Sequence, residues 1–315
     1  MAIVEWLLDS DPAIRWQVLH DLVRARDDVV KAERVRIATE GWGARLLDLQ
    51  SDDGTWAGGA CFPGVFDWQT LNEDNQPWTS TLPVLQLLQE FGIDPADPRV
   101  RHAIGAVAEH CVWEHDGQRF FDGEVEPCIN GRTVALGAYF GVNVDGVVDR
   151  LLAEQLEDGG WNCEAERGSV RSSFHTTINV LEGLLRYEIA SGASDRTTAA
   201  RRRGEEYMLE RSLFRRKSTG AVVDPAYLMF SFPVRWFYDV LRALDYFRAT
   251  GDAPDPRIDE AIGIVRSKQQ PDGRWLLENT HGGEVPFALE DGDGQPSRWN
   301  TLRALRVLRW YDQSR

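Results

Sequence analysis

A seven-residue motif returns three times along the chain and constrains its fold more than any other feature. The pattern Gln-x-x-Asp-Gly-x-Trp occupies residues 50–56, 155–161 and 269–275. Weaker copies lie at 116–120 and 218–220, so the motif glycines recur every 42 to 63 residues. A recurrence of this size indicates a repeat architecture in which similar units stack on one another. We expect the glutamine to bind helix-end carbonyls, the aspartate to cap the next amides and the tryptophan to pack over the turn.

The segments between the motifs carry the apolar periodicity of helices. Apolar stripes run through 147–152, just before the second motif, and through 178–185, after it. One set of helices is apolar on nearly all sides and is expected to begin near Pro12, Trp78, Cys128, Ser173, Pro233 and Ser297. A second, amphipathic set ends at the motifs and is expected at 30–50, 98–112, 147–155, 197–213 and 257–269. The sequence therefore predicts an all-α fold, a single α/α toroid over residues 1–315. About six helical hairpins would form its inner and outer rings, with Ile3–Leu8 as the last outer helix.

Composition narrows the classes of function. The chain has 35 Lys+Arg against 50 Asp+Glu, a formal net charge of −15. This acidity argues against binding to nucleic acids, whose partners present a basic surface, and against docking on anionic lipid. No apolar run approaches the length that crosses a bilayer, and no basic region precedes an apolar stretch at the start. Four cysteines are too few for a disulfide scaffold, so we expect a cytoplasmic protein with free thiols or thiolate ligands.

The motif, joined to helical hairpins, resembles that of the α/α toroid superfamily. This superfamily includes the squalene and oxidosqualene cyclases, the β subunits of protein prenyltransferases and related small bacterial proteins. The resemblance covers nearly the whole chain and implies the toroid fold, but no single reaction, because the superfamily hosts several chemistries. Its triterpene cyclases start their reaction with an Asp-x-Asp-Asp motif. Neither that motif nor Asp-Asp-x-x-Asp occurs in this sequence.

Two cysteines and a histidine are expected to meet at one end of the ring. Cys128 opens one predicted inner helix, His175 opens the next, and Cys163 lies in the loop before it. A helix N-terminus favours a thiolate and keeps a nearby imidazole neutral, and these are the forms that bind metals. Two sulfurs and one nitrogen predict a Zn²⁺ site with one position open to water or substrate. The alternative is that all three are ordinary buried groups.

This constellation resembles the zinc site of the prenyltransferase β subunit, in which acidic-x-Cys begins one inner helix and aromatic-His-Thr begins the following one. Glu126 and Cys128 match the first pattern, and residues 174–176 match the second. The interval of 47 residues between Cys128 and His175 is shorter than in that family. Cys163 is an extra thiol, which leaves open whether Glu126 or Cys163 completes the ligand set. Cys61 is a further candidate ligand.

Three Arg-Trp pairs lie near the starts of predicted inner helices, where the helix dipole disfavours cations. They are Arg15-Trp16, Arg235-Trp236 and Arg298-Trp299. Together with Trp78 and Tyr238, they predict a cavity mouth with positive charge and aromatic walls. Such a mouth suits an anionic head group with an apolar tail. The alternative is that the arginines pair with the nearby acids Asp9, Asp11, Asp239 or Glu290.

His281 precedes the last predicted inner helix and is a candidate catalytic acid–base group or a plain loop residue. The expected function is a zinc-dependent transferase, resembling the prenyltransferase β subunits, that activates a thiol or other nucleophile in the central cavity. Its substrate would be a small molecule such as an isoprenoid diphosphate, and no partner subunit is expected. The alternatives are a squalene-type terpene cyclase-like enzyme without metal, and a non-catalytic toroid that binds a lipid or isoprenoid.

Overall fold

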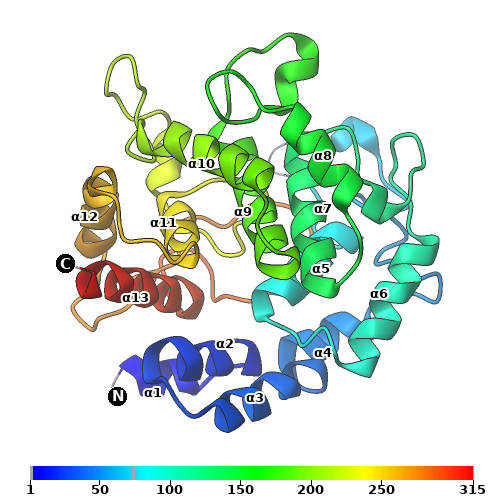
Figure 1. The fold of residues 1–315 in the computed structure, drawn as a ribbon. Coiled ribbons are helices and arrows are strands. Elements are labelled where there is room, and N and C mark those ends of the chain that lie inside the picture. The colour runs from blue at the N-terminus through cyan, green and yellow to red at the C-terminus, as the bar shows by residue number, and fades with distance from the viewer. Residues whose placement is uncertain (1–2, 73–74, 315) are drawn as a thin grey trace.

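Helices arranged in a closed ring make up the structure, a computed structural model in which residues 3–72 and 75–314 are described (Figure 1). The all-α class predicted from the sequence is confirmed. Within the described part of the chain, the only strands longer than an isolated bridge are β1 (Trp275–Leu276) and β2 (Pro296–Ser297), which pair antiparallel. None of the helices in this part of the chain combines the length and apolarity needed to cross a membrane.

The helices alternate between an inner and an outer layer along the chain (Figure 1). The inner helices are α2 (Pro12–Gln17), α5 (Thr81–Phe91), α7 (Pro127–Phe140), α9 (Phe174–Ser191), α11 (Val240–Ala249) and α13 (Arg298–Gln313). The helices outside them are α1 (Ile3–Leu8), α3 (Asp27–Val35), α4 (Gly41–Asp48), α6 (Pro98–His110), α8 (Asp145–Ala153), α10 (Asp195–Leu209) and α12 (Asp259–Ser267).

Two helix boundaries differ from the sequence prediction. The predicted outer helix at 30–50 is divided into α3 and α4, because the chain turns at Gly41, whose φ of +65° favours glycine. Helix α11 begins at Val240 rather than near Pro233, because the Asp239 side chain caps it by accepting from the backbone N–H of Arg242 at 2.8 Å. Residues 233–239 therefore form an irregular segment at the inner wall.

A close helix contact fixes the side of the ring that carries the candidate site. Helices α7 and α9 approach so tightly at Gly131 that an added Cβ would lie 2.5 Å from the carbonyl oxygen of Asn179. A real Cβ does not tolerate such a distance, so only glycine permits this approach. The beginnings of α7 and α9 are thereby held side by side.

The three complete motifs form nearly identical turns. In each, the indole Nε1 donates at 2.7 Å to a carbonyl ten residues earlier, near the end of an outer helix. The pairs are Trp56 with Leu46, Trp161 with Leu151 and Trp275 with Val265. The backbone N–H of each tryptophan also donates to a threonine hydroxyl in the first turn of the next inner helix. These threonines are Thr81, Thr177 and Thr301. The motif thus joins an outer helix to the inner helix that follows it.

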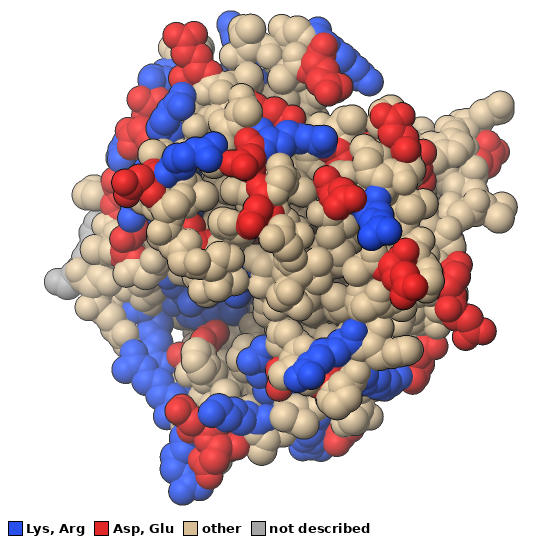
Figure 2. Space-filling view, turned by 45° about the vertical axis from the view of Figure 1, so that its right-hand side comes forward, with Lys and Arg blue, Asp and Glu red and all other residues tan. Residues whose placement is uncertain are grey.

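The two ends of the chain close the ring. The Arg298 guanidinium at the start of α13 donates to the carbonyl oxygen of Asp9 at 2.8 Å, just after α1. Near the other end of α13, Arg309 donates to the carbonyl oxygens of Asp21 and Leu22 at 3.0 and 2.6 Å. In the space-filling view one face is hollowed, and Lys and Arg side chains border the hollow (Figure 2).

Candidate functional site

Two thiols and a carboxylate converge where α7 begins. Glu126 is the residue before α7, Cys128 lies in its first turn, and Cys163 follows the second motif turn. The Cys128 thiol donates to Glu126 Oε2 at 3.4 Å, and Cys163 Sγ lies 3.5 Å from the hydroxyl of Thr176. The two sulfurs and a carboxylate oxygen of Glu126 lie within 4.8 Å of one another. Residues 37 positions apart in the chain therefore form one three-donor cluster.

The cluster is electrostatically unfavourable for anions. The hydrogen bond with Cys163, burial and the charge of Glu126 all raise the pKa of the Cys128 thiol well above its usual value. Two thiolates beside a carboxylate would repel one another strongly in this partly dry position. A bound divalent cation reverses this preference, because it stabilises the deprotonated thiols. These three donors are therefore a set that could hold a divalent cation.

The residues present fit zinc. Zinc–sulfur bonds of about 2.3 Å and zinc–oxygen bonds of about 2.1 Å put tetrahedral donors roughly 3.5–4 Å apart. A cluster within 4.8 Å needs only small side-chain movements to reach those separations. Two sulfurs and one oxygen are also a borderline-soft set, which suits Zn²⁺ better than Mg²⁺ or Ca²⁺. Three protein donors leave a fourth position for water or substrate.

His175, predicted as the third ligand, lies outside this cluster. Its nitrogens do not fall within 4.8 Å of all three donors. Instead, Nδ1 accepts a hydrogen bond from the backbone N–H of Tyr238 at 2.9 Å, which leaves the proton on Nε2. Burial lowers the pKa of His175 to about 4, so the ring is neutral. Glu126, which the sequence left as an alternative, takes the third place in the cluster.

The three Arg-Trp arginines have separate surroundings. Arg15 bonds Glu33 at 2.5 Å and the Ser10 carbonyl at 2.6 Å, on the outer side of α2. Arg298 donates to the Asp9 carbonyl and so contributes to the closure of the ring. Only Arg235 enters the interior: it is 7% exposed, and its guanidinium lies 5.1 Å from the centre of the Trp78 ring. The predicted three-arginine mouth is therefore replaced by a single buried arginine.

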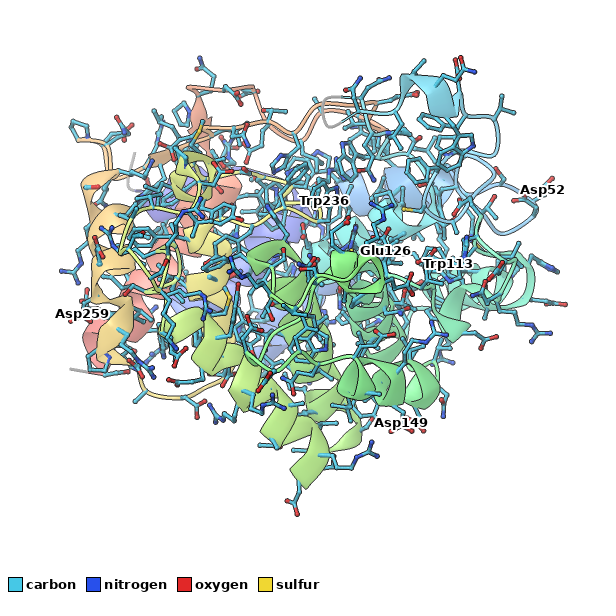
Figure 3. The ribbon with its side chains drawn as sticks, turned by 90° about the horizontal axis from the view of Figure 1, so that it is seen from above. Asp52, Trp113, Glu126, Asp149, Trp236 and Asp259 are labelled. Atoms are coloured by element: carbon cyan, nitrogen blue, oxygen red, sulfur yellow. The ribbon has the colours of Figure 1, made fainter. Side chains whose placement is uncertain are left out.

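The aromatic residues predicted for the cavity mouth also have separate surroundings. Trp236 stacks on Phe237 with ring centres 3.9 Å apart, and its Nε1 donates to Gln76. Figure 3 shows Trp236 and Glu126 toward the same end of the ring, away from Asp149 in α8 and Asp259 in α12. Tyr238 is buried, and its hydroxyl donates to the Leu213 carbonyl.

Two further predicted tryptophans pack within the helical layers. Trp299 stacks on Phe232 with ring centres 4.4 Å apart, and Trp16 donates to the Phe91 carbonyl at 2.6 Å. Of the predicted aromatics, Trp78 contacts the Arg235 guanidinium, and Trp236 and Tyr238 lie with Arg235 in the irregular segment 233–239.

His281, the predicted acid–base group, stacks on Phe237 with ring centres 3.9 Å apart and planes 11° from parallel. Its buried Nε2 has no hydrogen-bond partner among the described residues. Burial, together with the positive charge of Arg235, lowers its pKa to about 3. Both His175 and His281 are therefore neutral groups on the same aromatic wall.

Sequence reasoning missed two charged residues that face the interior from inner helices. Arg132 lies one turn after Cys128 on α7 and is 5% exposed. Glu90 lies near the end of α5, and its buried Oε2 has no hydrogen-bond partner among the described residues. Burial raises the pKa of Glu90 and lowers that of Arg132 to about 10. The sequence does contain a signal for both residues, because each is a charged side chain within a predicted inner helix that is otherwise mostly apolar.

Neither a protein-family model nor a curated protein sequence matches the chain. Among solved structures, two variants of the type II terpene cyclase MstE from Scytonema, each in complex with geranylgeranyl dihydroxybenzoate, are similar to it. The first matches with a TM-score of 0.46 and 15% identity, over 96% of this chain and 87% of the cyclase. The second matches with a TM-score of 0.43 and 15% identity, over 94% and 84%.

Proposed function

We propose that the chain is an enzyme in which Glu126, Cys128 and Cys163 hold Zn²⁺ and so activate a nucleophile, foremost a thiol, of a small-molecule substrate. The observation that carries this proposal is the convergence of two sulfurs and a carboxylate oxygen within 4.8 Å. The neighbourhood adds support, because Cys128 and Cys163 are only partly exposed and the aromatic wall of Trp236 and Phe237 lies at the same end of the ring.

Each residue has a defined part in this chemistry. Bound zinc would lower the pKa of a coordinated thiol or water, making a nucleophile at neutral pH. Cys128 and Cys163 fix two donor positions, and a carboxylate oxygen of Glu126 supplies the third, so the proton of the Cys128 thiol would be released to solvent when the metal binds. Thr176 orients Cys163, since its hydroxyl lies 3.5 Å from the sulfur. His175 has no part in metal binding in this proposal. Its ring packs edge-on against the Trp236 ring, with ring centres 5.4 Å apart, and so forms part of the aromatic wall.

Elemental analysis of purified protein tests the metal site. We expect stoichiometric zinc in the wild type and its loss in Cys128→Ser and Cys163→Ser. The matched control is Cys111→Ser, because Cys111 is buried at the end of α6, where its thiol donates to the Thr81 hydroxyl, away from the cluster. Turnover of an allylic diphosphate with added thiol should follow zinc content. Protein that binds no zinc when offered it, or a Cys128→Ser, Cys163→Ser double variant that retains zinc, would contradict the proposal.

A terpene cyclase-like enzyme without metal is the second candidate, and one observation favours it. The Glu90 carboxyl has a raised pKa and a buried Oε2 that no described residue bonds, as a proton donor in a dry interior requires. A polyprenyl substrate with chelator present would then give cyclised product. Glu90→Gln would abolish that product, and the Cys128→Ser, Cys163→Ser double variant would still form it. Ligand binding without product in any variant would instead indicate a carrier.

A further inference from the structure

Two arginines are buried in the ring without an anionic partner among residues 3–72 and 75–314. Arg132 is 5% exposed, and its Nε and one Nη have no hydrogen-bond partner among the described residues. Arg235 is 7% exposed, and within the same part of the chain its guanidinium contacts the Trp78 ring but takes part in no hydrogen bond or ion pair. Burying an uncompensated cation costs several kcal/mol, so unpaired buried arginines are rare.

Three other arginines of the inner helices lie beside carboxylates. Arg242 forms an ion pair with Glu182 at 2.6 Å, and Arg306 forms one with Asp245. Arg303 lies 4.0 Å from Asp245 and also donates to a backbone carbonyl. The fold therefore supplies carboxylates for these three guanidinium groups, whereas no carboxylate among the described residues forms an ion pair with Arg132 or Arg235.

The unpaired arginines repel each other across the interior. Burial is the main cause that lowers the pKa of Arg235 to about 9; the charge of Glu90 opposes this shift, and the positive charge of Arg132 contributes to it. Glu90 makes no hydrogen bond to either arginine, and its own raised pKa favours the neutral carboxyl. A negatively charged group bound between the two guanidinium groups would compensate their positive charges.

We propose that Arg132 and Arg235 bind the oxyanion head group of a ligand, a carboxylate or a phosphate, inside the ring beside Trp78. Guanidinium groups bind both kinds of oxyanion through paired N–H donors, and an anion would satisfy the orphaned donors and relieve the repulsion. This extends the proposed function by naming the charge of the substrate, and binding at this place requires no metal.

The surroundings hold the two arginines in place. Arg235 has a φ of +55°, which is rare for a residue with a side chain, and Arg242 secures this backbone by donating to the carbonyls of Arg235 and Phe237. Arg132 follows Cys128 by one helical turn, a rise of roughly 6 Å along α7. A head group bound by Arg132 would therefore lie one helical turn along α7 from the thiol cluster.

Calorimetric titration with inorganic phosphate, pyrophosphate and benzoate tests the site and separates the two sources of oxyanion. The titrations use chelator-treated full-length protein, so that binding to zinc does not contribute. We expect at least one of the three anions to bind wild type and to bind Arg132→Met and Arg235→Met at least ~10-fold more weakly. The matched control is Arg26→Met, because Arg26 is 81% exposed and pairs only with Asp28; it should bind as wild type does.

Stability provides an independent readout. Without ligand, Arg132→Met should melt at a higher temperature than wild type, because it removes an unpaired buried charge. An arginine with a purely structural role would give the opposite shift, so a less stable or unfolded Arg132→Met would overturn the inference. It would also be overturned if wild type bound none of the three anions without metal, or if both methionine variants bound them as wild type does. Absence of zinc from the protein would leave this result untouched.

Discussion

At the scale of single residues, the interior is shaped by buried groups whose ionisation is opposed by dehydration. His281 is the simplest case, because its neutral ring is held by stacking on Phe237 and no described residue bonds its Nε2. Its pKa is lowered from 6.5 to about 3 in the folded chain. The unfolded chain therefore binds a proton at a pH where the folded chain does not.

We predict that His281 makes folding sensitive to mild acid. A lowered folded pKa contributes stability that is complete above pH 6.5 and is lost as pH falls toward 3. Between pH 7 and pH 4, wild type should lose about 2–3 kcal/mol more unfolding free energy than His281→Phe, which keeps the stack. Denaturant unfolding at the two pH values measures the difference. Equal losses in both proteins would show that His281 titrates normally.

Part of the candidate site could be predicted from the sequence. Cys128 and Cys163 were expected to converge because each lies at the mouth of a neighbouring inner helix, and the structure brings them together. His175 starts the right helix, but the N–H of Tyr238 occupies its Nδ1, and that contact depends on the path of an irregular loop. Arg132 escaped notice because the inner helices were treated as uniformly apolar.

At the scale of elements, the motif turns act as clamps between successive helices. Each motif tryptophan fills buried space and ties an outer-helix carbonyl to the next inner helix. The glutamines reach further, since Gln50 and Gln155 also donate to carbonyls of the next outer helices, α6 and α10. The sequence predicted that the tryptophan packs over the turn, but its assignment of the helix-end carbonyls to the glutamine was wrong, because the indole Nε1 binds them.

We predict that Trp161→Phe lowers the free energy of unfolding, because it removes one of these hydrogen bonds. The substitution keeps an aromatic ring but leaves the Leu151 carbonyl without its indole donor, so unfolding free energy should fall by about 2 kcal/mol. Trp68→Phe is the control, because Trp68 is 55% exposed and should change stability by less than about 0.5 kcal/mol. Chemical denaturation compares them. A neutral Trp161→Phe would mean that the hydrogen bond does not clamp the helices.

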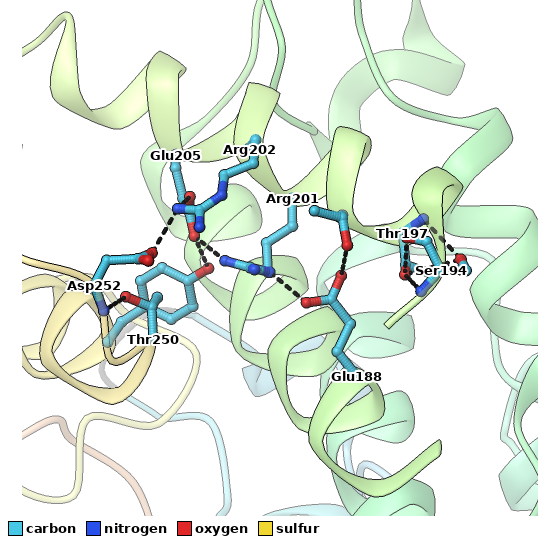
Figure 4. Close-up of polar contacts among 10 residues, drawn as sticks. Glu188, Ser194, Thr197, Arg201, Arg202, Glu205, Thr250 and Asp252 are labelled. Carbon is cyan, nitrogen blue, oxygen red and sulfur yellow. Dashed lines mark hydrogen bonds and ion pairs between the residues drawn. The ribbon is translucent and has the colours of Figure 1, made fainter. Parts of the chain in front are cut away.

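A buried ion network joins α9, α10 and α11 (Figure 4). Arg201 of α10 bonds Glu188 of α9 at 2.7 Å and also bonds Glu205, whose carboxylate accepts from the Tyr246 hydroxyl at 2.7 Å. The arginine and both carboxylates are nearly inaccessible to water. Removing one partner therefore leaves buried charge behind.

We predict that Arg201→Met destabilises the chain by about 3–5 kcal/mol. Arg167→Met is the matched control, because the Arg167 side chain is 80% exposed and its pair with Glu164 should contribute no more than about 1 kcal/mol. Thermal unfolding of both variants measures the contrast. Similar small losses in the two would place the Arg201 network among weak surface contacts.

At the scale of the whole molecule, the closed ring follows from the recurrence of the motif, and its closure depends on the chain ends. The guanidinium groups of Arg274 and Arg298 lie over the Trp6 ring at 4.2 and 4.7 Å, so α1 is held by residues near the opposite end of the chain. The alternation of inner and outer helices could be predicted from periodicity, but the division of residues 30–50 into α3 and α4 could not. The start of α11 could not, because a capping aspartate and a left-handed Arg235 override the apolar pattern there.

Opening the closure should loosen both ends together. Trp6→Ala removes the ring beneath two arginines, and we expect faster amide hydrogen exchange in α1 and in α13 at once. Trp68→Ala serves as the control, since Trp68 packs in an exposed aromatic loop with Phe62 and Phe66. Exchange that accelerates in α1 alone would show that the N-terminal helix is an appendage and not part of a closed ring.

X-ray absorption at the zinc edge tests the central claim most directly, because it reports the atoms bound to the metal. For zinc-loaded wild type we predict two sulfur neighbours at about 2.3 Å with lighter atoms completing the shell. The sulfur signal should vanish in the Cys128→Ser, Cys163→Ser double variant. A wild-type spectrum containing only oxygen and nitrogen neighbours would contradict the account of the site.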